Sequence, residues 1–85
     1  NDLQTTIFPN PTSSTLNVAI GSKFERSIVI EIVTLDGKEV LRESRNLHAG
    51  DTILDLQVGQ FQNGLYVLRI HAGDELIHKK FNISH

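Results

Sequence analysis

The fold is decided by residues 28–43, which read IVIEIVTLDGKEVLRE. The first six of these residues are apolar except for Glu31, and their β-branched side chains fit the pleated surface of a buried strand. The pair Asp36-Gly37 separates this run from a second run at residues 38–43. Asp-Gly between two such runs is a strong hairpin signal. The sequence therefore predicts a central strand with an antiparallel neighbour.

The charges of this hairpin agree with its turn. A two-residue loop of type I′ at the Asp-Gly pair would place Val33 opposite Val40. In the same register Glu31 would face Arg42, so the one charge of the first strand would meet an opposite charge. Such a cross-strand pair contributes ~0.2–1 kcal/mol. Turn chemistry and charge pairing thus predict the same register.

Short apolar runs continue on both sides of this hairpin, with apolar side chains at every second position. This alternation is typical of strands with one buried face, and no segment keeps a helical spacing over three turns. Residues 55–62 leave room for one helical turn at most. With turns at a spacing of roughly ten residues, the runs predict a small all-β, immunoglobulin-like antiparallel β-sandwich of about seven strands. The further runs are residues 16–20, 52–56, 65–70 and 76–83.

The last two strands form a second hairpin around residues 73–74. This loop would place Tyr66 opposite Phe81 on an apolar, inward face. Lys79 falls on that same face, which indicates either a bulge or a position at the sheet edge. The opposite face is polar and carries Arg69, His71, His78, Lys80 and Asn82.

Composition limits the classes of protein that the chain can represent. Its 85 residues carry 8 lysines and arginines against 10 acidic residues, for a formal net charge of −2, and there is no cysteine. A chain of this length forms one domain, without the deep cleft of a two-domain enzyme. The near-balanced charge argues against nucleic acid as a partner. No run approaches the ~18 consecutive apolar residues of a membrane span.

Side chains with catalytic or metal-binding chemistry are scattered. His71 and His78 flank the last hairpin on its polar face, but a metal site needs a third ligand, and neighbouring Arg69 is a cation. Ser13 and Ser14 lie in a loop without the pattern of a nucleophile elbow. Without cysteine the chain has no disulfide and no thiolate metal site. We therefore expect no enzymatic activity, no cofactor and no metal.

Three local features carry unusual residue combinations. Residues 7–11 read IFPNP, and the two prolines stiffen the backbone around Asn10. Residues 61–66 read FQNGLY, a turn followed by a strand that starts near its tyrosine. Residues 79–83 read KKFNI, a basic and apolar final strand. Taken alone, each has a purely structural interpretation. These are a rigid turn, a tyrosine that fills one end of the sandwich, and an edge strand whose lysines prevent pairing with other chains.

In their order and spacing, these features resemble the C-terminal sorting domain of cargo proteins exported by the Por (type IX) secretion system. The resemblance runs from Ile7 to Ile83 and includes LDGKEV at residues 35–40. The family pattern has an aromatic or apolar residue before Pro-Asn-Pro, a D-x-x-G-[KR] hairpin, G-x-Y opening a strand, and a basic and apolar final strand. The hairpin aspartate of the family would fall at Thr34, although Asp36 lies closer to the turn.

The resemblance implies a non-catalytic signal that directs a larger cargo protein through the outer membrane, for surface attachment or release. The chain would pass through the periplasm and reach the cell surface or the extracellular space. Its implied partners are the outer-membrane secretion machinery, a sortase-like peptidase and an upstream cargo domain in the same chain. Residues 1–6 would then be a linker from the cargo, and residues 7–85 the sorting sandwich.

The resemblance also implies where recognition occurs. A stable sandwich would present a backbone edge and a basic last strand to a receptor, in the manner of β-strand addition. The linker would be oriented by Pro9, Asn10 and Pro11. The expected recognition residues are Lys79, Lys80, Phe81 and Ile83, with Gly64 and Tyr66 positioning the strand.

Two alternatives stay open at this point. The domain could form a homodimer through an edge strand. It could also be a stand-alone carbohydrate-binding or adhesion module, for which Phe8 or Phe24 would supply the sugar platform.

Overall fold

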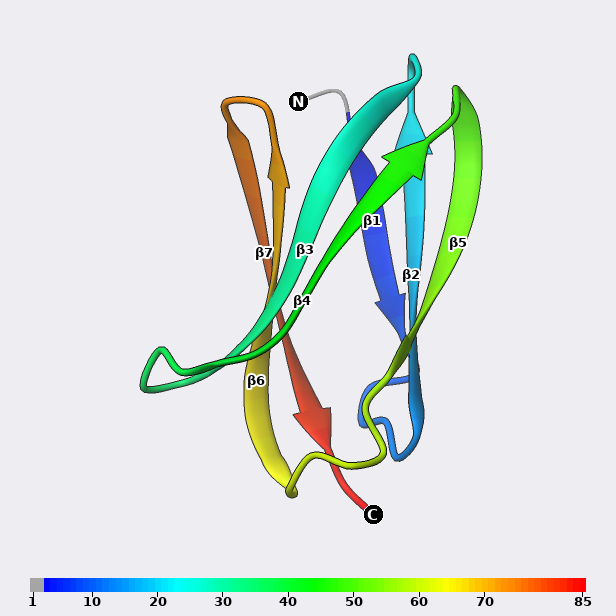
Figure 1. The fold of residues 1–85 in the computed structure, drawn as a ribbon. Coiled ribbons are helices and arrows are strands. Elements are labelled where there is room, and N and C mark those ends of the chain that lie inside the picture. Colours follow the sequence, from blue (N-terminus) through cyan, green and yellow to red (C-terminus); the bar gives the residue numbers. More distant parts are fainter. Residues whose placement is uncertain (1–2) are drawn as a thin grey trace.

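The computed structural model describes residues 3–85 as a sandwich of seven strands (Figure 1). A three-stranded sheet in the order β1-β2-β5 packs on a four-stranded sheet in the order β4-β3-β6-β7, and neighbouring strands within each sheet are antiparallel. The predicted all-β sandwich is confirmed. The strands are β1 (Gln4–Phe8), β2 (Thr15–Ser22), β3 (Arg26–Thr34), β4 (Glu39–Leu47), β5 (Gly50–Gln57), β6 (Gly64–Ala72) and β7 (Glu75–Ile83).

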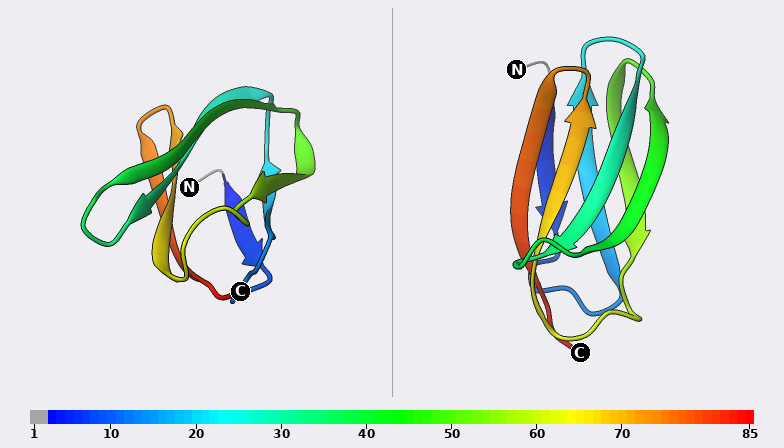
Figure 2. Two further views of the ribbon diagram at one scale, coloured as in Figure 1. Left: turned by 60° about the horizontal axis from the view of Figure 1, so that its bottom comes forward. Right: turned by 60° about the vertical axis from the view of Figure 1, so that its left-hand side comes forward.

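Alternating side chains build the core between the two sheets, which Figure 2 shows as two layers. Every second residue of each long strand points inward, because successive side chains of a strand face opposite sides. No helix among the described residues 3–85 is long and apolar enough to cross a membrane. The largest fully buried side chains are Phe81, Leu16, Ile20, Ile28, Ile30, Ile32, Leu47, Leu56, Leu68, Ile70, Ile83 and Val18.

The β3–β4 hairpin keeps the predicted pairing except near its turn. Glu31 pairs with Arg42, as predicted. Val33, however, faces Glu39, because the register shifts between Ile32 and Val33. The predicted pair of Val33 with Val40 is therefore wrong.

The local cause is a three-residue loop. The Thr34 N–H donates to the Lys38 carbonyl at 2.8 Å, and the Gly37 N–H donates to the Thr34 carbonyl at 3.0 Å. Gly37 has a φ of 93°. Every residue with a positive φ among residues 3–85 is a glycine, so Asp36 has a negative φ. Asp36 thus lacks the conformation of a type I′ turn. Its carboxylate instead accepts a hydrogen bond from the Thr34 hydroxyl, which stabilises the longer loop.

The β6–β7 hairpin confirms its predicted register without interruption. Tyr66 pairs with Phe81, and Lys79 pairs with Leu68. Gly73 has a φ of 62°, as the first central residue of a type II′ turn requires. No bulge occurs along this pair of strands. Lys79 therefore keeps its regular place in the pairing and lies at the edge of the sheet.

The sandwich begins earlier than expected. Leu3 is buried in the core, Gln4 pairs with Gly21, and Thr6 pairs with Ala19. Residues 3–6, expected in the linker, therefore belong to the sandwich, because Leu3 supplies apolar surface to the core. Residues 1 and 2 of that linker lie outside the described residues.

Candidate functional site

The predicted recognition strand, β7, is the outer strand of the four-stranded sheet, and β6 is its one neighbouring strand within the sheet. Phe81 and Ile83 point inward and are each 1% exposed. They cannot touch a partner while the domain is folded, so they act as anchors for the strand. Lys80 is exposed on the outer face, and Lys79 is half-buried at the edge. Only the lysines among these four residues are therefore accessible for contact.

The Pro-Asn-Pro loop contacts the end of this strand. The backbone N–H of Asn82 donates to Asn10 Oδ1 at 3.0 Å. The Thr12 N–H donates to the Asn82 carbonyl at 2.9 Å, and the Ser84 N–H donates to the Thr12 carbonyl at 2.9 Å. We call Asn10 and Thr12, with these three hydrogen bonds, the clasp. Figure 1 shows the loop after β1 and the chain end after β7 at the same end of the sandwich.

The clasp changes the interpretation of the prolines. Pro9 and Pro11 were expected to orient an incoming linker, and the structure places them on either side of the clasp residue Asn10. Because proline fixes φ, the two rings restrict the backbone that carries the Asn10 side chain. Their part in orienting a linker stays a prediction.

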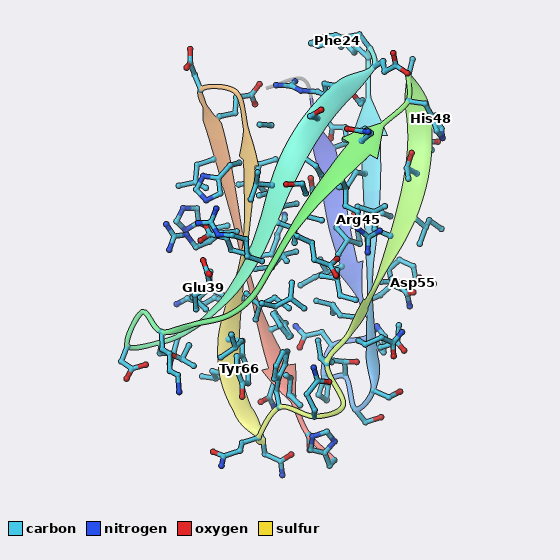
Figure 3. All side chains as sticks on the ribbon, viewed as in Figure 1. Phe24, Glu39, Arg45, His48, Asp55 and Tyr66 are labelled. Atoms are coloured by element: carbon cyan, nitrogen blue, oxygen red, sulfur yellow. The ribbon has the colours of Figure 1, made fainter. Side chains whose placement is uncertain are left out.

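Tyr66 supports β7 from within. Its hydroxyl donates to the Gln62 carbonyl at 2.6 Å, four residues upstream. Its ring lies 5.9 Å from that of Phe81 and 6.2 Å from that of Phe61, measured between centroids. Tyr66 lies near the start of β6 (Figure 3), the arrangement known in immunoglobulin-like sandwiches as a tyrosine corner.

Gly64 precedes this tyrosine and pairs with Ile83. Its φ of 151° lies in a region that favours glycine. Beside it, Asn63 Oδ1 accepts a hydrogen bond from the His85 backbone N–H at 2.9 Å, and His85 Nε2 lies 2.7 Å from the Phe61 carbonyl oxygen. The turn before β6 therefore holds the residues that follow β7. Nothing in the sequence pattern predicted the contacts of His85.

A charged cluster lies on the outer face of the four-stranded sheet. Glu31 on β3 is 5% exposed, and its Oε2 accepts a hydrogen bond from Arg42 Nη2 at 2.9 Å. Arg69 Nε lies 3.8 Å from Glu31 Oε1, and His71 Nε2 forms a hydrogen bond with the same oxygen. Glu39 accepts a hydrogen bond from Arg42 Nε at 3.1 Å. The sequence predicted only the pair of Glu31 with Arg42.

The pKa of Glu31 is lowered from 4.5 to about 2 in this cluster. Glu39 and His71 belong to the hydrogen-bonded network around this carboxylate, which favours its ionised form, and the charges of Arg42 and His71 add to that effect. Together these effects outweigh the opposing effect of burial. The carboxylate therefore stays ionised near neutral pH and connects β3 to β4 and β6.

The cations of the last strand lack such partners. Within residues 3–85, the side chains of Lys79 and Lys80 form no ion pair and no hydrogen bond, and the same holds for the side chain of His78. No group of three metal-ligating side chains was found among these described residues either. Residues 76–80 of β7 thus carry two unpaired lysines and no acidic residue, while Glu75 begins the strand at the turn.

Comparison with known proteins matches residues 6–84 to the secretion system C-terminal sorting domain. No curated protein matches the chain. The matched residues include the clasp, Tyr66 and all of β7. Membership marks a type IX sorting signal that is attached to an upstream cargo domain and recognised by the secretion machinery, in a protein exported to the cell surface or the extracellular space. The chain therefore belongs to the secretion system C-terminal sorting domain family.

Proposed function

We propose that this domain leads its cargo through the outer membrane by docking on the secretion machinery through the accessible part of β7. The observation that carries this proposal is the division of β7 into two parts. From Asn82 onward its outer edge is bonded to the clasp, whereas Lys79 and Lys80 carry unpaired positive charges beside an edge without a neighbouring strand.

The predicted site residues then act in different ways. Lys79 and Lys80 contact the receptor, because their charges are available. Phe81 anchors the strand in the core, and Tyr66 supports it by stacking and by its hydrogen bond to Gln62. Asn10 keeps the end of the strand attached to the sandwich. The domain itself contributes position and charge, while the catalytic steps belong to other proteins.

Removal of the domain would be the work of the sortase-like peptidase, with the cargo then attached to surface lipopolysaccharide or released. A peptidase requires an extended and accessible backbone. Since Leu3 is buried and Gln4 already pairs with Gly21, a cut that leaves the sandwich intact falls ahead of Leu3.

The alternative, a carbohydrate-binding module, depends on exposed aromatic rings that act together. Phe8 and Phe24 are 41% and 49% exposed. They lie at opposite ends of the sandwich, since Phe8 ends β1 whereas Phe24 lies in the loop after β2 (Figures 1 and 3). The ring of Phe24 is also covered by the guanidinium carbon of Arg26, 5.1 Å from its centroid. The geometry therefore favours the sorting function.

An export assay tests the proposal. Residues 1–85 are fused behind a reporter that carries a signal peptide, in a host that has the secretion machinery. We expect the reporter at the cell surface or in the medium, and we expect Lys79→Gln with Lys80→Gln to reduce this fraction. Lys23→Gln with Lys38→Gln, a matched removal of two charges in exposed loops outside β7, should export normally. Retention of the unmodified fusion in the periplasm contradicts the proposal.

A further inference from the structure

The clasp reveals which backbone groups of β7 face outward. Asn82 uses its N–H and its carbonyl, and Ser84 its N–H, to bond the loop on the outer side. Because residues of an antiparallel strand turn their backbone groups alternately to the two sides, the other even-numbered residues also face outward. Leu76, His78 and Lys80 thus each present one donor and one acceptor along the outer edge.

The length of this free edge is limited at both ends. The hairpin turn at residues 73–74 ends β7 on one side, with Ala72 paired to Glu75. On the other side, Thr12 occupies the position that an added strand would need beyond Lys80, and Thr12 forms a parallel bridge with Ile83. A strand added along β7 would therefore have to stop at Lys80.

The charge beside this edge is positive on both faces. Lys79 and Lys80 are consecutive, so their side chains leave opposite faces of the sheet. Lys80 shares the outer face with His78, which lies opposite Arg69. An added strand would also carry consecutive side chains on opposite faces. Two adjacent carboxylates would therefore meet both lysines at once.

The other three edges suit an acidic strand less well. β4 has the register shift near its turn, and its Arg42 and Arg45 are already paired with carboxylates. β1, with the sequence QTTIF, carries no basic side chain. β5 carries Asp51 and Asp55, which would repel an acidic segment. Bulges and charges of this kind are common protections of sheet edges.

We propose that the free edge of β7 binds, by antiparallel or parallel strand addition, an extended acidic segment of about five residues from the secretion machinery. Two adjacent carboxylates of that segment lie beside Lys79 and Lys80. The clasp sets the register, because Asn10 and Thr12 block the edge beyond Lys80. This inference rests on the proposed function and names the chemistry of the partner.

The probe is a synthetic six-residue peptide of threonine and valine with two acidic residues at its centre, titrated into the 85-residue chain by calorimetry. We expect saturable binding that weakens as salt is added, since exposed charges are screened. Lys79→Gln with Lys80→Gln should weaken binding by about tenfold. A peptide with two central glutamines should bind as weakly to the unmodified domain.

A proline substitution tests the backbone part of the proposal. His78→Pro removes an N–H that faces outward and is not bonded to β6, so the ladder between β6 and β7 is kept. We expect this variant to fold and to lose peptide binding. Ile53→Pro is the matched control, because Ile53 is an exposed residue of the β5 edge. It should bind the peptide like the unmodified domain.

Several results would overturn the proposal. Equal binding of the acidic and glutamine peptides removes the role of charge, and undiminished binding by a folded His78→Pro variant removes strand addition. If His78→Pro does not fold, the lysine variants and the glutamine peptide still decide. Sedimentation that shows a dimer, lost in Lys79→Gln with Lys80→Gln, would make a second copy of this chain the occupant and contradict the proposal.

Export of the same variants separates this inference from the proposed function. Failure of the unmodified fusion to reach the surface refutes the proposed function itself. Normal export of both the unmodified fusion and a folded His78→Pro fusion refutes only strand addition at β7. We expect export of the unmodified and Ile53→Pro fusions, and loss of export for His78→Pro.

Discussion

Asn10 accepts, through its Oδ1 atom, a hydrogen bond from the backbone N–H of Asn82 at 3.0 Å. The loop that follows the first strand therefore holds the end of the last one. This contact joins two sequence motifs that lie at opposite ends of the chain. It also separates the part of β7 that is bonded within the domain from the part that is available to a partner.

The clasp should depend on the side-chain oxygen of Asn10. Asn10→Ala removes the acceptor and leaves the Asn82 N–H without its partner, which should cost about 1 kcal/mol of unfolding free energy. Asn10→Asp keeps an acceptor oxygen and should retain most of the stability. Urea unfolding of both variants measures the difference. Equal stability of the alanine variant and the unmodified domain would show that the Asn10 side chain contributes nothing to the stability of the clasp.

Variants of two adjacent residues, Lys80 and Phe81, should separate a role in receptor contact from a role in the stability of the domain. Phe81→Ala removes a ring that is 1% exposed and stacked on Tyr66, and such truncations cost about 3–5 kcal/mol. Lys80→Gln changes an unpaired, exposed side chain and should leave the unfolding free energy within about 0.5 kcal/mol. Both should lower export, the first through unfolding and the second in a folded domain. Thermal unfolding and export are measured on the same variants, and a Lys80→Gln variant that loses export because it unfolds would argue against a contact role.

Acid should destabilise the domain through Glu31. The folded-state pKa of this residue lies below its ordinary value, so the stability it contributes is present above about pH 5 and is lost as pH falls towards about 2. Glu31→Gln should lower stability at neutral pH, because Arg69 loses its carboxylate and Arg42 keeps only that of Glu39. It should also flatten the pH dependence in the acidic range. The measurement is urea unfolding of both proteins between neutral and acidic pH, and an unchanged slope in the variant would contradict the assignment.

The turn between β3 and β4 should require glycine at one position. Gly37 has a φ of 93°, so Gly37→Ala forces a side chain into a strained conformation and should cost about 1–2 kcal/mol. Gly59→Ala is the matched control. A Cβ at residue 59 would meet Ser14 Cα at 3.7 Å, an ordinary contact, so this variant should melt close to the unmodified domain. Similar melting temperatures for the two variants would contradict the loop geometry.

Much of the fold could be predicted from the sequence, because alternation and turn residues are local signals. The register of the last hairpin followed from residues 73–74 alone. The first turn did not, since the hydroxyl of Thr34 and the carboxylate of Asp36 stabilise a longer loop than the Asp-Gly pair indicates. The start of the sandwich was also missed, because a single buried Leu3 carries no periodic pattern.

The site was less predictable, because its contacts are between distant strands. The pair of Glu31 with Arg42 follows from one hairpin, whereas Arg69 and His71 join it only because β6 lies on the other side of β3. The sequence likewise placed Phe81 and Ile83 at the recognition end without distinguishing anchors from contacts. Their positions in the strand could have made that distinction, because inward and outward residues of a strand alternate and Lys80 precedes Phe81 directly.

Hydrogen exchange of the β7 amides tests the central claim most directly. That claim is that the strand is ordered, free on its outer side up to Lys80, and held by the clasp from Asn82 onward. We predict fast exchange at Leu76, His78 and Lys80, and slow exchange at Asn82 and at the odd-numbered residues bonded to β6. Protection of Lys80, or exchange of Asn82 as fast as that of His78, would contradict it.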